Sequence, residues 1–308
     1  MNGQLGLQFQ PRAQVQLNRV SLRRGDSSLN ASGSLWPRLD LRSRQATLGP
    51  QLLRPLRPLL GSDPRLATQW HLHGRAGRPL LDVALQQGTH PLLGPVQAQL
   101  RWQPGLLELR RLQAPELTAS GRLPYRNLAA GGLKPGLLTL DLDLRRYRLD
   151  RLAPLVGSRL RGQLTAWGQI RGPLQALVPD LQLLVQRPGV GPLQLEESWQ
   201  GQLLGTSTGG ADLSLQPQAP AAPGQLLARL DRRWLPQTVR LQRDAGELAF
   251  TGSPRRYLWQ ARAFPLDGLR FAFGPRGLFQ PLQGLLTGKG QLDPVSYTHL
   301  TLPTKRIV

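Results

Sequence analysis

Two histidines have a spacing that suits metal binding. His71 and His73 flank Leu72 in the segment QWHLHGR, and residues two apart on a β-strand point to the same face of the sheet. Two imidazoles on one face are a legitimate start for a metal site, because imidazole is a common ligand of transition metals. The alternative is an exposed strand face opposite Trp70 and Leu72. We favour this second interpretation and expect no metal ion.

Carboxylates stand in pairs at Asp141/Asp143 and Glu196/Glu197. Acid–base catalysis would need environments that push the two pKa values of a pair apart. The first pair lies on the polar side of an alternating segment, where solubility and protection of a strand edge explain it. The glycine-rich segment GTSTGGAD (205–212) is flanked by expected strands and is interpreted as a turn. With no nucleophile elbow or metalloprotease motif, we expect a protein that is not an enzyme and binds no cofactor.

The composition is strongly basic, with 39 Lys+Arg against 18 Asp+Glu and a formal net charge of +21. The arginines are spread along the whole chain, whereas a nucleic-acid-binding protein gathers them on one face among aromatic residues. We therefore expect no nucleic acid as a partner, and a basic exterior that faces solvent or anionic lipid head groups. The absence of cysteine excludes disulfides, thiolate metal sites and cysteine nucleophiles.

Strict alternation of apolar and polar residues is the main structural signal. In LLTLDLDLRR (137–146), Leu138, Leu140, Leu142 and Leu144 fall on one side and polar residues on the other, which is the period of a half-buried strand. Similar runs recur along the chain, and glycine and proline separate them at hairpin spacing. The pattern predicts an antiparallel β fold.

Helical periodicity is rare and short. Segments 49–60, 148–156 and 277–283 each have room for one or two turns, and prolines within them limit any helix. The fold class expected is therefore all-β, an elongated and curved antiparallel sheet with a few short helical turns.

Two phrases repeat. SLNASGSL, ELTASGRL and ELAFTGSP place glycines at Gly33, Gly121 and Gly252, where we expect the sheet to bulge or bend. LRGQLTAWGQIRGPL (160–174) matches LATQWHLHGRAGRPL (66–80) in register. The separations are long and irregular, which favours an elongated β array over a propeller or a sandwich of fixed units.

The domain organisation expected is one repetitive β groove over residues 1–294. The stretch QPQAPAAPG (216–224) is the best candidate for a long loop. The final segment VSYTHLTLPTKRIV (295–308) changes composition, and we interpret it as foreign to the rest of the chain.

An antiparallel sheet with one apolar face has to cover that face. The chain can fold back as a sandwich, close on itself, or curl into a trough, and the irregular repeat favours the trough. Burying a CH₂ group is worth about 0.8 kcal/mol, so a leucine-lined trough lowers a barrier on the order of 13 kcal/mol for a sixteen-carbon acyl chain that leaves a membrane. The residues expected to line this groove and face lipid are Leu138, Leu140, Leu142, Leu144, Leu164, Ile170, Leu181, Leu183 and Val185.

The chain also resembles a known family. The L-x-A-S-G-x-L hairpins, the phrase LRGQLTAWGQIRGPL followed by DLQLLV, and the short segment LDRLAPLVG are similar to the TamB branch of the AsmA-like envelope proteins, in particular the cyanobacterial or plastid type. The resemblance covers roughly residues 1–294.

This resemblance implies a curved β groove that bridges the inner and outer membranes for phospholipid transfer or outer-membrane protein assembly. Its implied partners are phospholipid acyl chains, both membranes and an outer-membrane assembly barrel protein. The implied location is the cell envelope or periplasm, with an inner-membrane anchor. No such anchor and no C-terminal assembly domain are recognisable in the sequence, so we expect an interior fragment.

Two other functions stay open. One is a structural β scaffold that pairs its open edge with the strands of client proteins. The other is a basic surface protein that binds polyanions, for which binding would fall steeply with salt.

Overall fold

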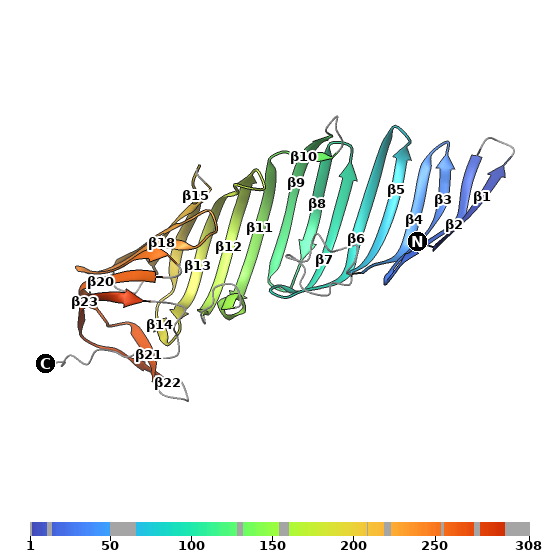
Figure 1. Cartoon of the computed structure of the whole chain (residues 1–308). Helices are drawn as coiled ribbons and strands as arrows, with labels where there is room; N and C mark the ends of the chain where they lie inside the picture. Colours follow the sequence, from blue (N-terminus) through green and yellow to red (C-terminus); the bar gives the residue numbers. More distant parts are fainter. Residues whose placement is uncertain are drawn as a thin grey trace. The chain divides into compact units, whose positions relative to one another are not determined.

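A computed structural model of the chain describes residues 2–10, 14–49, 66–127, 132–153, 160–207, 209–218, 223–253, 256–273 and 278–292. Within these ranges lie 23 strands and one 3-10 turn, η2 (Leu149–Leu152). The all-β antiparallel fold predicted from the sequence is confirmed (Figure 1). The chain divides into two compact units: unit 1 comprises Met1–Arg145 and Gly168–Leu177, and unit 2 comprises Arg146–Trp167 and Val178–Val308.

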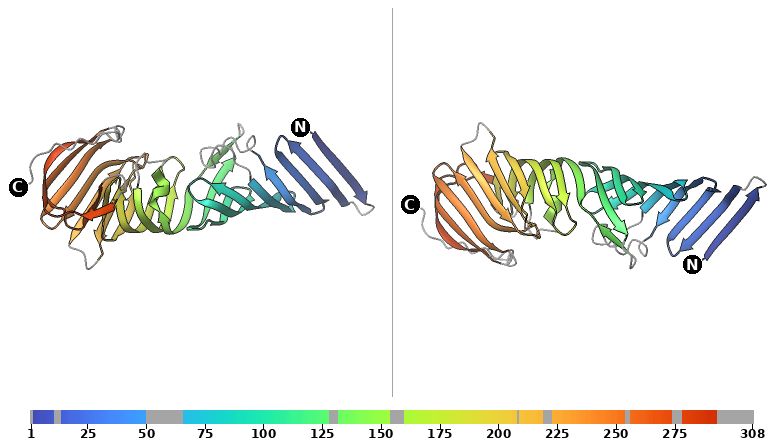
Figure 2. Two further views of the ribbon diagram at one scale, coloured as in Figure 1. Left: turned by 90° about the horizontal axis from the view of Figure 1, so that it is seen from below. Right: turned by 90° about the horizontal axis from the view of Figure 1, so that it is seen from above.

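Unit 1 is an open meander in which strands that follow one another in the chain lie side by side (Figures 1 and 2). Strand β9 pairs with both β10 and β11 after it. Strands β11 and β12 contribute residues to both units. The strands up to this point are β1 (Asn2–Gln10), β2 (Gln14–Arg24), β3 (Ser27–Trp36), β4 (Leu39–Leu48), β5 (Leu66–Arg75), β6 (Arg78–His90), β7 (Gly94–Gln103), β8 (Leu106–Gln113), β9 (Leu117–Asn127), β10 (Leu133–Pro135), β11 (Leu138–Arg148) and β12 (Leu160–Gly172).

Unit 2 continues as a meander from β13 through β15 to β20, and β23 pairs with β20. A second set of pairings joins β13 to β14, β14 to β21 and β21 to β22. These strands are β13 (Val178–Val190), β14 (Leu193–Leu195), β15 (Trp199–Gly205), β16 (Ala211–Pro217), β17 (Gly224–Leu230), β18 (Pro236–Arg243), β19 (Gly246–Ser253), β20 (Arg256–Pro265), β21 (Leu269–Phe273), β22 (Leu278–Pro281) and β23 (Leu285–Leu292).

The glycines of the first repeated phrase lie where neighbouring strands approach closely. Gly33 has a φ of +143° and Gly252 a φ of +152°, a region that side chains other than glycine rarely adopt. A Cβ at Gly33 would lie 1.9 Å from the carbonyl oxygen of Asp40, and one at Gly252 would lie 2.2 Å from that of Arg256. The phrase therefore marks a tight contact with the next strand as well as an irregular backbone.

The prediction for segment 277–283 is wrong: its described residues form strand β22 (Leu278–Pro281), which pairs with β21. Pairing with a neighbouring strand outweighs the weak helical pattern there. Of segment 148–156, residues 149–152 form the turn η2. Residues 50–60 lie outside the described residues.

The other two segments singled out in the sequence fall partly or wholly outside the described residues. The expected loop at 216–224 begins at the end of β16 and ends at the start of β17, and residues 219–222 between them are not described. The expected foreign tail at 295–308 lies wholly outside the described residues. Within the described ranges, we find no helix of the length and apolar character needed to cross a membrane.

Candidate functional site

Unit 1 carries rows of apolar side chains that run across its strands on one face. Residues directly opposite each other in an antiparallel pair place their side chains on the same face. We call the surface made by two such rows the apolar face. Its first row is Leu41, Leu72, Leu81, Trp102, Leu107 and Leu123, and its second row is Trp70, Val83, Leu100, Leu109 and Leu140.

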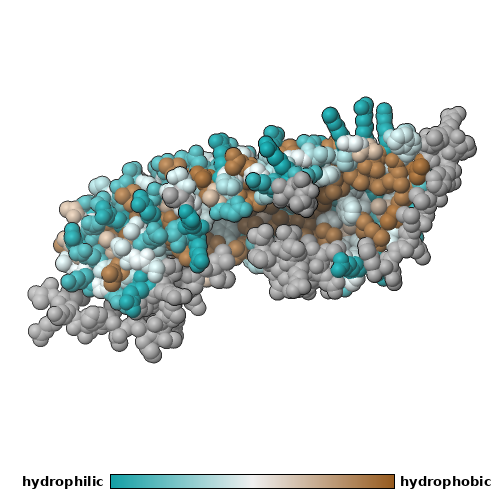
Figure 3. Space-filling model, turned by 45° about the horizontal axis from the view of Figure 1, so that its top comes forward, coloured by the Kyte–Doolittle hydropathy of each residue, from teal (hydrophilic) through white to brown (hydrophobic). Residues whose placement is uncertain are grey.

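The apolar face is only partly covered. Every side chain of its two rows is half-buried rather than buried. Figure 3 shows apolar side chains gathered on a hollowed surface over the strands of unit 1, in the right half of the view. A hollow of about 430 Å³ on β4–β8 is lined by residues of both faces, among them Ser43, Trp70 and Val83 as well as His71 and Asp82 of the opposite face. The hydroxyl of Ser43 is buried there without a hydrogen-bond partner among the described residues.

The nine residues expected to line a groove divide between the two units. Leu138, Leu140, Leu142, Leu144 and Ile170 are half-buried in unit 1. Of these, Leu140 lies opposite Gly121 and Leu142 opposite Ala119, so both stand on the same side of the sheet as the apolar face.

The other four of the nine residues belong to unit 2. Leu164 is half-buried. Leu181, Leu183 and Val185 on β13 are 6%, 8% and 9% exposed. These three side chains therefore lie in the core of unit 2 and offer little surface to a ligand.

Unit 2 covers much of its own apolar side. Trp199, Phe264 and Pro179 are the largest fully buried side chains of the described chain, and all three belong to this unit. After β20 the chain returns to the start of the meander, because β21 pairs with β14, which follows β13 directly.

A buried ion pair holds this return in place. Arg243 at the end of β18 donates a hydrogen bond from Nη2 to Glu197 Oε1 at 2.6 Å, and the two side chains are only 6% and 9% exposed. Arg243 also donates from Nη1 to the carbonyl oxygen of Asp267 in the turn before β21. One guanidinium therefore joins three segments that are far apart in the chain.

The opposite face of unit 1 is polar and paired. Asp82 on β6 accepts two hydrogen bonds from Arg101 on β7, at 2.7 and 2.8 Å, and lies 3.0 Å from Nε2 of His73 on β5. The hydrogen bonds from Arg101 lower the pKa of Asp82 to about 2, and that of His73 acts in the same direction. His71 Nε2 lies 2.8 Å from Asp40 Oδ1, and this contact lowers the pKa of Asp40.

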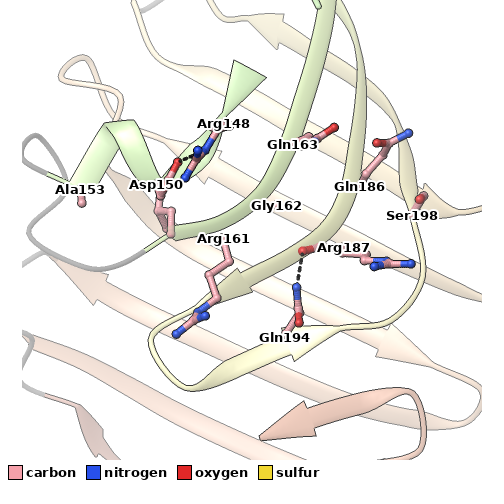
Figure 4. A pocket seen from close by; sticks show the side chains of 11 residues that line it. Arg148, Asp150, Ala153, Arg161, Gly162, Gln163, Gln186, Arg187, Gln194 and Ser198 are labelled. Atoms are coloured by element: carbon pink, nitrogen blue, oxygen red, sulfur yellow. Dashed lines mark hydrogen bonds and ion pairs between the residues drawn. The ribbon is translucent and has the colours of Figure 1, made fainter. Parts of the chain in front are cut away.

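A further cavity belongs to unit 2 and is lined mainly by polar residues. It has a volume of about 1000 Å³ between η2, the start of β12 and the turn from β13 to β14. Figure 4 shows Arg148 paired with Asp150 at its edge and Gln194 bonded to the backbone of Arg187. Arg161 is held by the carbonyl oxygen of Gly191 and by the Phe279 ring. No nucleophile and base are paired among its lining residues, so it does not indicate a reaction.

The sequence placed His71 and His73 on one exposed strand face, and the structure places them on the polar face, half-buried. Their carboxylate neighbours were missed because Asp40 and Asp82 come from the strands on either side of β5. These side chains come together only when β4, β5 and β6 are paired in register, which the sequence alone does not give. The one signal available in the sequence was the alternation within each strand, which indicates the face on which a side chain lies.

Comparison of the chain with protein-family models, with curated proteins and with solved structures gave no match.

Proposed function

We propose that the apolar face of unit 1 binds the acyl chains of lipids, and that the protein works without catalysis as part of a lipid-conducting β groove in a cell envelope. One observation carries this proposal: apolar side chains stand in register across β4–β9, and in one row as far as β11, yet remain half-buried. Monomeric soluble proteins rarely leave such a continuous apolar surface exposed without a function.

The dimensions and energy of this face suit an acyl chain. Strands in a sheet lie about 4.8 Å apart, so the five steps from β5 to β11 give the second row a length of about 24 Å. The hydrocarbon core of a bilayer is about 30 Å thick, so this row exceeds the roughly 15 Å that one leaflet occupies. Each CH₂ group kept from water is worth about 0.8 kcal/mol.

The charge of the chain suits the other end of a lipid. A formal net charge of +21 favours contact with anionic head groups, at about 1 kcal/mol for each Lys or Arg near a membrane surface. The partners in this proposal are phospholipids and the two membranes of an envelope, as the resemblance to the TamB branch implies.

The test uses adjacent residues on opposite faces of β11. A photo-crosslinking residue at position 140 is compared with one at position 141 in the full chain, incubated with phospholipid vesicles. Leu140 stands on the apolar face, whereas Asp141 faces the other side and accepts a hydrogen bond from Gln169 at 2.7 Å. We expect lipid crosslinks at 140 and few at 141. Equal crosslinking at both positions would refute the proposal.

Native mass spectrometry of the purified chain supplies the second readout. We expect phospholipid to accompany the wild type and to be lost in Leu140→Asp, while Asp141→Asn retains it. A folded wild type that never carries lipid would favour a scaffold that binds client proteins.

A further inference from the structure

We propose that His71, His73 and Asp82 form a site for a divalent transition-metal ion of the zinc type on the polar face of unit 1, with Asp40 beside His71. This site lies on the opposite side of the sheet from the apolar face and does not depend on lipid binding. It departs from the sequence analysis, which favoured an exposed strand face with no metal ion.

The three ligand residues already lie close together. One ligand atom from each of His71, His73 and Asp82 falls within 4.8 Å of the others. Zinc bonds of about 2.0 to 2.2 Å in tetrahedral geometry place ligand atoms roughly 3.3 Å apart. Small side-chain rotations are therefore enough to close the site.

The hydrogen bonds of the cluster have the arrangement that a metal ion would use. His73 Nε2 lies 3.0 Å from Asp82 Oδ2, and His71 Nε2 lies 2.8 Å from Asp40 Oδ1. In each contact a proton bridges an imidazole nitrogen and a carboxylate oxygen. A metal ion bound by His71, His73 and Asp82 has two nitrogen ligands and one oxygen ligand from the chain, a donor set that suits zinc, nickel or copper better than calcium or magnesium.

The surrounding groups hold these ligands in position. The two histidine rings stack with their centroids 4.4 Å apart, which keeps both side chains on one side of β5. Arg101 bonds to both oxygens of Asp82, and Arg42 bonds to Asp40 at 3.1 Å. Outer partners of this kind fix the orientation of ligating carboxylates. Both histidine side chains are half-buried and open to solvent, so an ion can reach them.

The experiment measures Zn²⁺ binding to the full chain, expressed without a histidine tag, by equilibrium dialysis and by calorimetry. We expect one Zn²⁺ ion per chain at this site, and a higher melting temperature because the ligands join β5 and β6. Mg²⁺ should produce neither effect. His73→Gln and Asp82→Asn should each weaken Zn²⁺ binding by more than about tenfold.

His90→Gln is the matched control, since it removes an imidazole at the end of β6, outside the cluster. We expect it to bind Zn²⁺ as the wild type does. Circular dichroism checks that each variant remains folded. The proposal is overturned if the wild type binds no Zn²⁺, or if His73→Gln and a separate His71→Gln variant, both folded, bind it as tightly as the wild type.

Discussion

Arg243→Met tests how much the buried ion pair of Arg243 with Glu197 stabilises unit 2. The change keeps most of the side-chain volume but leaves the carboxylate of Glu197 buried without its partner, and leaves the carbonyl oxygen of Asp267 without its donor. Removing one partner of a buried pair typically costs about 3 to 5 kcal/mol of stability. Because the pair is almost fully buried, we expect a loss in this range.

Arg229→Met is the control. Arg229 and Asp212 also form an ion pair in unit 2, at 3.0 Å, but their side chains are 66% and 50% exposed. Exposed pairs contribute about 0 to 1 kcal/mol. The two substitutions are chemically identical, so the difference between them isolates the effect of burial.

Urea denaturation of the full chain, together with amide hydrogen exchange at β14, β18 and β21, measures the result. We expect Arg243→Met to lose protection at these strands first. A double variant, Arg243→Met with Glu197→Gln, should be more stable than the sum of the single changes predicts, because it removes both charges. A loss below about 1 kcal/mol in Arg243→Met, or strictly additive effects, would refute the reasoning.

Three further predictions concern single positions. Trp199→Ala should lower the free energy of unfolding, measured by thermal denaturation, by about 3 to 5 kcal/mol because the indole is fully buried. Trp36→Ala is the control: this side chain is 53% exposed, so its loss should change the free energy of unfolding by roughly 0.5 kcal/mol or less. Gly252→Ala should destabilise the chain by more than about 1 kcal/mol, since its φ is positive and the added Cβ meets a backbone oxygen; Gly77→Ala, with open space around it, should be tolerated. The pKa of Asp82 is lowered to about 2 from an ordinary 3.8, so the stability that its carboxylate contributes is present above pH 3.8 and is lost as the pH falls toward 2. With a chelator present, the wild type should be more stable than Asp82→Asn at neutral pH. This difference should shrink by at most about 2 kcal/mol between pH 3.8 and pH 2.

The alternation of residues was sufficient to predict the strands. The segment 137–146 was expected as a strand with four leucines on one side, and β11 spans Leu138–Arg148 with Leu140 in that position. Alternation of apolar and polar residues with a period of two predicts which face of a strand is apolar, because successive side chains point to opposite faces.

The same pattern does not state what covers the apolar side. Leu140 on β11 and Leu183 on β13 look alike in sequence, yet one is half-buried and the other is in a core. Unit 2, unlike a simple meander, contains distant contacts such as the pairing of β14 with β21 and the ion pair of Arg243 with Glu197, which are 46 residues apart in the chain. No local pattern contains a contact of that separation.

The meander of unit 1 has an evolutionary consequence. Because the strands from β1 to β9 pair with their immediate neighbours in the chain, a whole hairpin can be duplicated or deleted while the remaining pairs keep their register. Each duplication would lengthen the apolar face by about 9.6 Å and add its own stability, as in other repeat architectures. Natural selection can therefore adjust the reach of such a sheet in steps of one hairpin without redesigning a core.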